Sequence, residues 1–221
     1  FLDTVTHELR TPITAIRAAS EILHDDDDVP DQLKKQFLQN IISESDRLNR
    51  LIDKILDLEK FETGKQKINV QKNNIVATIE QALEPLYQLI KNKNISTYVE
   101  SADEVYAYYD EERIIQVLTN LVSNAVKFCP EIDGLITIQV VDKEEFIQVS
   151  VTDNGKGIDK NDFENIFDKF YQSSNQNIKK PIGSGLGLAI CKQIVEYHKG
   201  KIWVQDSVKG ACIVFTLPKY K

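Results

Sequence analysis

A histidine, a glutamate and a threonine stand close together near the start of the chain, in the run His7-Glu8-Leu9-Arg10-Thr11-Pro12. A neutral imidazole nitrogen can act as a nucleophile, a carboxylate can orient the ring, and a hydroxyl can both donate and accept hydrogen bonds. Apolar residues at spacings of three and four predict a helix whose packed stripe lies away from the histidine: Leu2, Val5, Leu9, Ile13 and Ile16. His7 and Thr11 then share the exposed face. A lone exposed histidine is more often an ordinary surface side chain, so its role depends on the rest of the chain.

Two amides and an ammonium group share one stripe of another predicted helix, over residues 111–128. Asn120, Asn124 and Lys127 recur at i, i+4 and i+7, about 110° around the helix axis from the apolar face. Mg²⁺ prefers oxygen ligands, an amide oxygen supplies one without adding negative charge, and a lysine offsets phosphate charge. The row therefore suits a magnesium–polyphosphate ligand, and an ordinary solvated helix face accounts for it about equally well.

Two glycine-containing segments are placed to approach a nucleotide. The first, Asp153-Asn154-Gly155-Lys156-Gly157-Ile158, follows an apolar strand, where a simple hairpin turn is the alternative. The second, Gly183-Ser184-Gly185-Leu186-Gly187-Leu188, opens a predicted helix whose N-terminal amides can bind phosphate oxygens. The second segment lacks the spacing and the βαβ context of a dinucleotide-binding fingerprint, and no Walker-type phosphate loop occurs in the chain.

Five segments follow one another in the order found in sensor histidine kinases, and the resemblance covers nearly the whole chain. Residues 1–13 resemble the H-box, in which the histidine of H-E-x-x-T-P carries a phosphoryl group. Residues 120–128 resemble the N-box, N-L-x-x-N-A-x-K-F, and the segments beginning at Asp153 and Gly183 resemble the G1 and G2 boxes. The run Ile166-Phe167-Asp168-Lys169-Phe170-Tyr171 resembles the F-box.

The resemblance implies a role for each segment. His7 is the phosphoacceptor, Glu8 is its acid–base partner, and Thr11 completes the E-x-x-T pattern that the family associates with phosphatase activity. Asp153 accepts a hydrogen bond from the exocyclic amine of adenine, and Asn124 is the Mg²⁺ ligand. The residues expected to bind ATP are Asn120, Asn124, Lys127, Phe128, Asp153, Gly155, Gly157, Ile158, Phe170, Gly183, Gly185, Leu186, Gly187 and Leu188. The implied partner is the receiver domain of a response regulator, which takes the phosphoryl group on an aspartate.

Two positions depart from the family pattern. Gln172 stands where many relatives have an arginine, which leaves the basic contact with the γ-phosphate to Lys169, Lys179, Lys180 or another group. Cys129 stands where Ser or Thr is usual. Gln172 is the one feature that favours a rival interpretation, a dimerisation and signalling module that binds nucleotide without turnover. An ATPase clamp is a second rival, and it leaves the H-box hairpin unexplained.

The first 63 residues are predicted to form a helical hairpin. One helix runs to about His24, an acidic loop follows at 25–31, and a second helix continues to about Glu62. A two-helix hairpin of this length cannot bury both of its apolar stripes alone, so a homodimer is expected, with a four-helix bundle and with Leu51 and Ile55 in its seam. This dimerisation and phosphoacceptor domain ends at Thr63-Gly64-Lys65.

Residues 66–219 are predicted to form an α+β two-layer sandwich, the ATP-binding fold that histidine kinases share with gyrase and chaperone ATPases. Strands and helices mix without regular βαβ alternation, which argues against a doubly wound sheet. The expected strands lie near 68–70, 95–99, 105–109, 135–141, 146–152, 201–205 and 211–217, and the expected helices at 74–92, 111–128 and 186–198. Residues 172–182 are polar and suit a lid over ATP.

Composition limits the remaining possibilities. The net charge of −7 argues against nucleic-acid binding. No run approaches 18 apolar residues, which predicts no membrane span in this piece. The three cysteines are far apart and suggest buried free thiols in a reducing cytoplasm. Because the chain contains no methionine, we expect a fragment of a longer protein, attached to a membrane only through segments outside it.

Overall fold

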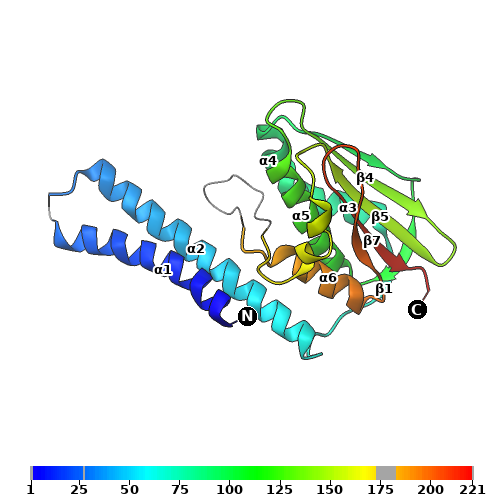
Figure 1. Cartoon of the computed structure of the whole chain (residues 1–221), viewed down its shortest axis with the longest axis horizontal. Helices are drawn as coiled ribbons and strands as arrows, with labels where there is room; N and C mark the ends of the chain where they lie inside the picture. The colour runs from blue at the N-terminus through cyan, green and yellow to red at the C-terminus, as the bar shows by residue number, and fades with distance from the viewer. Residues whose placement is uncertain (1, 27, 173–182, 221) are drawn as a thin grey trace.

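A computed structural model of the chain describes residues 2–26, 28–172 and 183–220. The chain begins with two long helices that lie side by side as a hairpin, α1 (Leu2–Asp25) and α2 (Asp31–Glu62), as Figure 1 shows. Both helices end within one residue of their predicted limits. Helix α1 continues through Pro12, which has no N–H for the carbonyl of Glu8, and the hydroxyl of Thr11 donates to the carbonyl of His7 at 3.3 Å. No helix in these described ranges is long and apolar enough to cross a membrane.

Helix α2 ends at a glycine, as its sequence predicts. Gly64 has a φ of +64°, which a side chain disfavours, and the backbone N–H groups of Lys65 and Gln66 both donate to the carbonyl of Lys60. The chain then leaves the hairpin and enters a mixed structure of sheets and helices.

The second part is a helical layer on a five-stranded sheet, the predicted α+β two-layer sandwich (Figure 1). The sheet order is β2-β4-β5-β7-β6, in which β2 and β4 are parallel and the other pairs antiparallel. Its strands are β2 (Ser96–Glu100), β4 (Leu135–Asp142), β5 (Phe146–Asp153), β6 (Ile202–Gln205) and β7 (Cys212–Pro218). Ile138, Val151 and Ile213 pair across three strands and are buried, so one face of the sheet forms the core.

The helices cover this apolar face of the sheet. They are α3 (Ile75–Leu83), α4 (Tyr87–Asn92), α5 (Glu111–Phe128) and α6 (Gly187–Tyr197). A separate antiparallel pair, β1 (Gln71–Asn74) and β3 (Tyr106–Tyr109), leads into α3 and α5. The apolar side of α5 is buried, as its periodicity predicts, and its first and last residues match the sequence expectation.

Two predicted elements differ in the structure. The helix expected over 74–92 is divided, because the short 3-10 segment Glu84–Leu86 carries Pro85 between α3 and α4. The strand expected at 68–70 instead begins at Gln71, where the chain pairs with β3. The alternation of Ile68 and Val70 with polar residues reflects partial burial of the linker outside regular pairing.

A buried histidine joins the start of α5 to the end of α6. Asp110 caps α5 by accepting from the backbone of Arg113 at 3.2 Å, and it also accepts from the backbone of Asn69 at 2.7 Å. Its own N–H donates to Nε2 of His198 at 3.0 Å, while Nδ1 of His198 lies 2.7 Å from the carbonyl of Ile194. Nε2 must therefore be unprotonated, and burial lowers the pKa of His198 against the opposing influence of the Ile194 carbonyl and Asp110.

This arrangement makes folding stability depend on pH. The unfolded chain binds a proton at His198 below about pH 6.5, and the folded chain does so only at lower pH, so the contribution of His198 is complete above that range and lost as the pH falls. We expect His198→Gln to flatten the dependence of the unfolding free energy on pH between about 5 and 7, as measured by urea denaturation. His24→Gln, which changes an exposed histidine, is the control and should leave the slope as it is. Equal slopes for wild type and His198→Gln would contradict the assignment.

Candidate active site

Asp153 is a buried carboxylate at the end of β5, only 6% exposed. Its Oδ1 accepts from the backbone N–H of Gly155 at 2.8 Å and of Ala211 at 3.3 Å. Burial raises the pKa of Asp153, and these two N–H donors act in the opposite direction. No described residue donates to Oδ2, so this oxygen can accept from a ligand such as the exocyclic amine of adenine.

The first glycine segment leaves no room for side chains. A Cβ on Gly155 would lie 2.2 Å from the carbonyl oxygen of Phe128, the last residue of α5. Gly157 has a φ of +79°, and its Cβ would lie 2.9 Å from the carbonyl oxygen of Gly210. Ile158 follows in a half-buried position. The structure thus brings the predicted residues Asp153, Gly155 and Phe128 together at one end of the sheet.

Sequence reasoning missed the loop that completes this corner. Gly210 has a φ of +75°, and a Cβ there would meet the carbonyl oxygen of Asp153 at 1.8 Å. Asn154 also has a defined role, because its Oδ1 accepts from Leu135 at 2.8 Å and its Nδ2 donates to Asp133 at 2.7 Å. Gly210 could have been found from the sequence, because it is a glycine just before the last predicted strand. Nothing in the local sequence predicts the role of Asn154.

The second glycine segment packs against the F-box. The N–H of Phe170 donates to the carbonyl of Gly185 at 2.9 Å, and both residues have positive φ, +62° and +67°. A Cβ on Gly185 would lie 2.6 Å from the carbonyl carbon of Phe170. The Gln172 amide donates to the carbonyl of Gly183 at 2.9 Å, which closes the base of the segment predicted as a lid. Beyond Gln172 that segment, including Lys179 and Lys180, lies outside the described residues.

The polar row of α5 lies beside the start of α6. Asn120 lies against Cys191. A Cβ on Gly187 would be 3.5 Å from Oδ1 of Asn120. Asn120 and Asn124 are half-buried, and Lys127 reaches solvent. Leu186 is fully buried and Leu188 half-buried, so the last part of the second glycine segment is held in the core.

These residues fit a magnesium nucleotide. The buried Oγ of Ser184 has no protein partner among the described residues, which suits a hydrogen bond to a phosphate oxygen. No described cluster of three or more His, Cys, Asp or Glu side chains is placed to hold a metal. The amide oxygen of Asn124, together with phosphate and water oxygens, is the kind of ligand that Mg²⁺ prefers.

His7 lies on the exposed face of α1, as predicted, and Glu8 beside it is half-buried. Among the described residues, no hydrogen bond or ion pair joins His7 to the glycine segments or to the α5 row. The Thr11 hydroxyl, one turn on, donates to the carbonyl of His7. The predicted site is thus in two parts, an acceptor on the hairpin and a nucleotide-shaped corner on the sandwich.

The two parts are held together by α2. Asp57 accepts from Arg113 at 3.4 Å and from Gln116 at 3.1 Å, and both donors are on α5. Phe61 is buried, and the Arg113 guanidinium lies over its ring, 5.6 Å from the ring centroid. The rings of Phe61 and Tyr197 meet edge-on, with their centroids 5.9 Å apart. Glu62 forms an ion pair with Lys169 of the F-box. Lys169, a candidate for the γ-phosphate contact, is therefore engaged with the hairpin in this arrangement.

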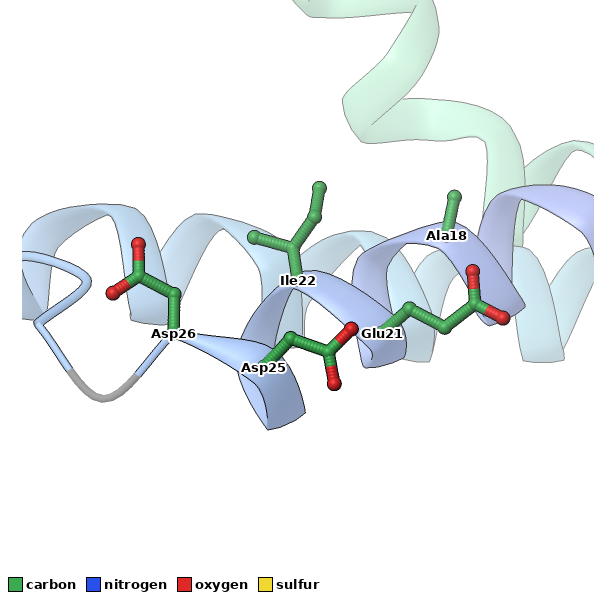
Figure 2. A pocket seen from close by; sticks show the side chains of 5 residues that line it. All are labelled: Ala18, Glu21, Ile22, Asp25 and Asp26. Carbon is green, nitrogen blue, oxygen red and sulfur yellow. The ribbon is translucent and has the colours of Figure 1, made fainter.

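A shallow hollow on the hairpin does not belong to this site. It is lined by Ala18, Glu21, Ile22, Asp25 and Asp26 near the turn between α1 and α2 (Figure 2). Three carboxylates around one isoleucine would repel phosphate, so the hollow does not suit a nucleotide.

The fold and the site define an ATP-binding sandwich preceded by a phosphoacceptor hairpin. Residues 109–221 match the family model described as "Histidine kinase-, DNA gyrase B-, and HSP90-like ATPase", and residues 1–64 match "His Kinase A (phospho-acceptor) domain". The chain therefore belongs to the sensor histidine kinases of two-component systems, and its class is that of the protein histidine kinases.

Similar proteins agree with this membership. The chain is 37% identical to the sensor histidine kinase WalK of Bacillus subtilis over 223 residues, which are 99% of this chain and 36% of the relative. It is 34% identical to the sensor protein KdpD of Clostridium acetobutylicum, of which it spans 24%. The histidine kinase ThkA, solved in complex with the response regulator protein TrrA, has a TM-score of 0.78 at 30% identity, over 98% of this chain and 60% of that one. The Acinetobacter baumannii histidine kinase AdeS shares the fold, with a TM-score of 0.81 at 22% identity, over 97% and 98% of the two chains.

The packing of Gly155 can be tested by adding one methyl group. Gly155→Ala should lower the unfolding free energy by about 1–3 kcal/mol, because the backbone at Phe128 has to move. Gly187→Ala is the matched control, because its Cβ meets only an ordinary contact at the first residue of α6, and it should be close to neutral. Urea denaturation of both variants measures the difference. Equal stability of the two variants would show that the backbone at Phe128 can move without a cost in stability.

Proposed function

We propose that the chain catalyses ATP-dependent phosphorylation of His7 and then transfers the phosphoryl group to an aspartate of a response regulator receiver domain. The observation that carries the proposal is the exposed His7 of a phosphoacceptor hairpin whose second helix is docked on the sandwich that carries a corner shaped for a nucleotide. We assign residues 1–63 to dimerisation and phosphoacceptance and residues 66–219 to ATP binding. The solved complex of ThkA with TrrA supports a receiver domain as the partner.

In the proposed binding mode, adenine occupies the corner at Asp153, whose free oxygen accepts from the exocyclic amine. Gly155 and Gly157 let the backbone approach the base, and the N-terminal turn of α6, with Gly185 before it, faces the phosphates. Asn120, Asn124 and Lys127 lie along the polyphosphate, with Asn124 as the metal ligand. Bound Mg²⁺ would neutralise part of the phosphate charge.

The proposed reaction is an in-line displacement. An unprotonated imidazole nitrogen of His7 forms a bond to the γ-phosphorus of ATP, while the bond from that phosphorus to the bridging oxygen breaks and its electron pair leaves with ADP. Glu8 orients the ring and accepts the proton from it. Adjacent helix residues do not face each other, so Glu8 has to turn alongside the ring to do so. Because ATP and receiver domains are cytoplasmic, we assign the reaction to the cytoplasm.

Incubation with γ-labelled ATP tests this proposal. We expect a protein-bound label that is lost in acid and stable in base, as a phosphoramidate is. His7→Gln should abolish the label and leave nucleotide binding intact. Acid-stable label, or label that survives this substitution, would identify a different acceptor. Nucleotide binding without any label in the wild type would favour the rival signalling module.

The hairpin also presents an apolar face that suits a second copy of the chain. Leu38 and Ile42 are one turn apart on α2 and are 52% and 55% exposed, and Ile13 on α1 is 51% exposed. Ile13 belongs to the α1 stripe that was predicted to be packed, Leu38 and Ile42 lie outside the predicted stripes, and the single chain leaves all three in water. Leu51, which was expected in the dimer seam, is instead buried within the chain at 4% exposure. We therefore propose a homodimer whose seam runs through the exposed residues.

Charges in this seam should separate the dimer. The double substitution Leu38→Lys and Ile42→Lys places two cations on the apolar face and should give a folded monomer in light scattering, because α2 keeps its contacts with the sandwich. Gln36→Lys and Gln39→Lys together add the same charge at exposed polar positions and should remain dimeric. A wild-type protein that is monomeric at micromolar concentration would contradict the proposed bundle.

We further propose that the hairpin removes phosphate from the regulator, with Thr11 as the residue that separates the two activities. Thr11 lies one turn beyond His7 on the exposed face, where a docked phosphoaspartate would approach, and its hydroxyl can hold an attacking water. The alternative is a structural role, because that hydroxyl donates to the carbonyl of His7 beside Pro12.

Thr14 offers a matched control for Thr11. Its hydroxyl makes the same kind of bond to the carbonyl of Arg10, at 2.8 Å. Thr11→Ala should keep self-labelling and lose dephosphorylation of a labelled regulator by about 100-fold, the size of a lost positioning group. Thr14→Ala should keep both activities. If Thr11→Ala reduces both activities together, the hydroxyl is structural and the phosphatase assignment is wrong.

A further inference from the structure

One face of α2 carries four residues at spacings of four, three and four: Arg50, Lys54, Asp57 and Phe61. These residues lie in one row along the helix. Asp57 and Phe61 contact Arg113 on α5, as described above. Lys54, one turn earlier and half-buried, continues the same row from the docked surface toward the hairpin turn.

This row lies along the nucleotide-facing row of α5. Asp57 bonds Gln116, and one turn beyond Gln116 on α5 comes Asn120, which lies against Cys191 of α6. Lys54 is the next residue of the α2 row on that side of Asp57, and its positive charge contributes to the lowered pKa of Lys127 on α5. Moving back along α2 from Asp57 therefore corresponds to moving forward along α5, toward the proposed phosphate-binding residues.

The two ends of this interface differ in charge balance. At one end Asp57 neutralises Arg113. The other end carries the cations Arg50 and Lys54 on α2 and Lys127 on α5, and no ion pair joins any of them to a carboxylate within the described part of the chain. Burial lowers the pKa of Lys54, and Arg50 adds to the effect. Partial burial also lowers the pKa of Lys127, and the positive charge of Lys54 lowers it further. Gathered like charges are unfavourable unless an anion lies between them.

We propose that Lys54 is a nucleotide-binding residue that the hairpin supplies to the ATP site. In the docked arrangement its ammonium group pairs with a phosphate oxygen of the nucleotide, opposite Lys127. Nucleotide binding and docking of α2 then stabilise each other, because one polyphosphate neutralises cations from both parts. The inference rests on the proposed nucleotide site, and it adds a contact from outside the ATP-binding motifs. The simpler alternative is that Lys54 lays its aliphatic chain on α5 and α6 and extends its charge into solvent.

Calorimetric titration of the whole chain with Mg²⁺ and a non-hydrolysable ATP analogue tests the contact. Lys54→Gln should weaken binding by about fivefold or more, a typical size for coupling between sites, and the loss should shrink as salt is raised. Lys54→Arg keeps the charge and should retain most of the affinity. Lys60→Gln removes an exposed lysine from the same helix and should bind as wild type does.

Amide hydrogen exchange adds a readout that a packing role would not change. The analogue should slow exchange across residues 50–58 of wild-type α2 and should not do so in Lys54→Gln. Unchanged affinity in Lys54→Gln, or equal loss in Lys54→Gln and Lys54→Arg, would overturn the inference while leaving the nucleotide site in place. A wild-type protein that does not bind the analogue would overturn both this contact and the proposed function.

Discussion

The architecture of the site depends on a carboxylate that is buried at the end of a strand. Asp153 can be buried because two backbone N–H groups, from Gly155 and Ala211, bond one of its oxygens. Each donor comes from a loop that only glycine permits, since a Cβ at Gly155 or Gly210 would strike backbone atoms. The carboxylate thus fixes the end of β5, the first glycine segment and the start of β7 relative to one another. The second oxygen of Asp153 is left for a ligand, which links the stability of this corner to its proposed use in adenine recognition.

A second constraint joins this corner to the hairpin. Helix α5 carries the proposed phosphate-facing row on its later turns and the Arg113 contact with α2 on its first turn. Its start is capped by Asp110, which also contacts the linker at Asn69 and the end of α6 at His198. Helix α2 is therefore connected to the nucleotide-facing elements through one helix and its cap. The ion pair of Glu62 with Lys169 adds a connection to the F-box. In this arrangement α2 contacts the sandwich through its last turns. The proposed transfer to His7 on α1 requires the γ-phosphate to reach the other helix of the hairpin.

The amino-acid sequence predicts elements well where a local signal decides them. The limits of α5 follow from its apolar periodicity, and the end of α2 follows from Gly64. The glycines of both segments could be predicted because a close approach of the backbone requires glycine, which is visible at a single position of the sequence. Contacts between distant segments left no such signature, so the roles of Gly210, Asn154 and His198 emerged only in three dimensions. Leu51 was misassigned for the same reason: a helical stripe shows that a residue is buried, and it does not show whether the sandwich or a second chain covers it. The division of the helix over 74–92 could have been inferred from Pro85.

The most direct test of the account is the choice of base at Asp153. A carboxylate oxygen accepts from the exocyclic amine of adenine and would face a carbonyl oxygen in guanine. Titration of the whole chain with Mg²⁺ and ADP or GDP should therefore show tight binding of ADP and affinity for GDP lower by about 10⁴-fold, the discrimination typical of a site built around one such bond. Asp153→Asn should weaken ADP binding in the same assay. Equal affinities for the two nucleotides in the wild type would show that the base lies elsewhere, and the assignment of the site around Asp153 would be wrong.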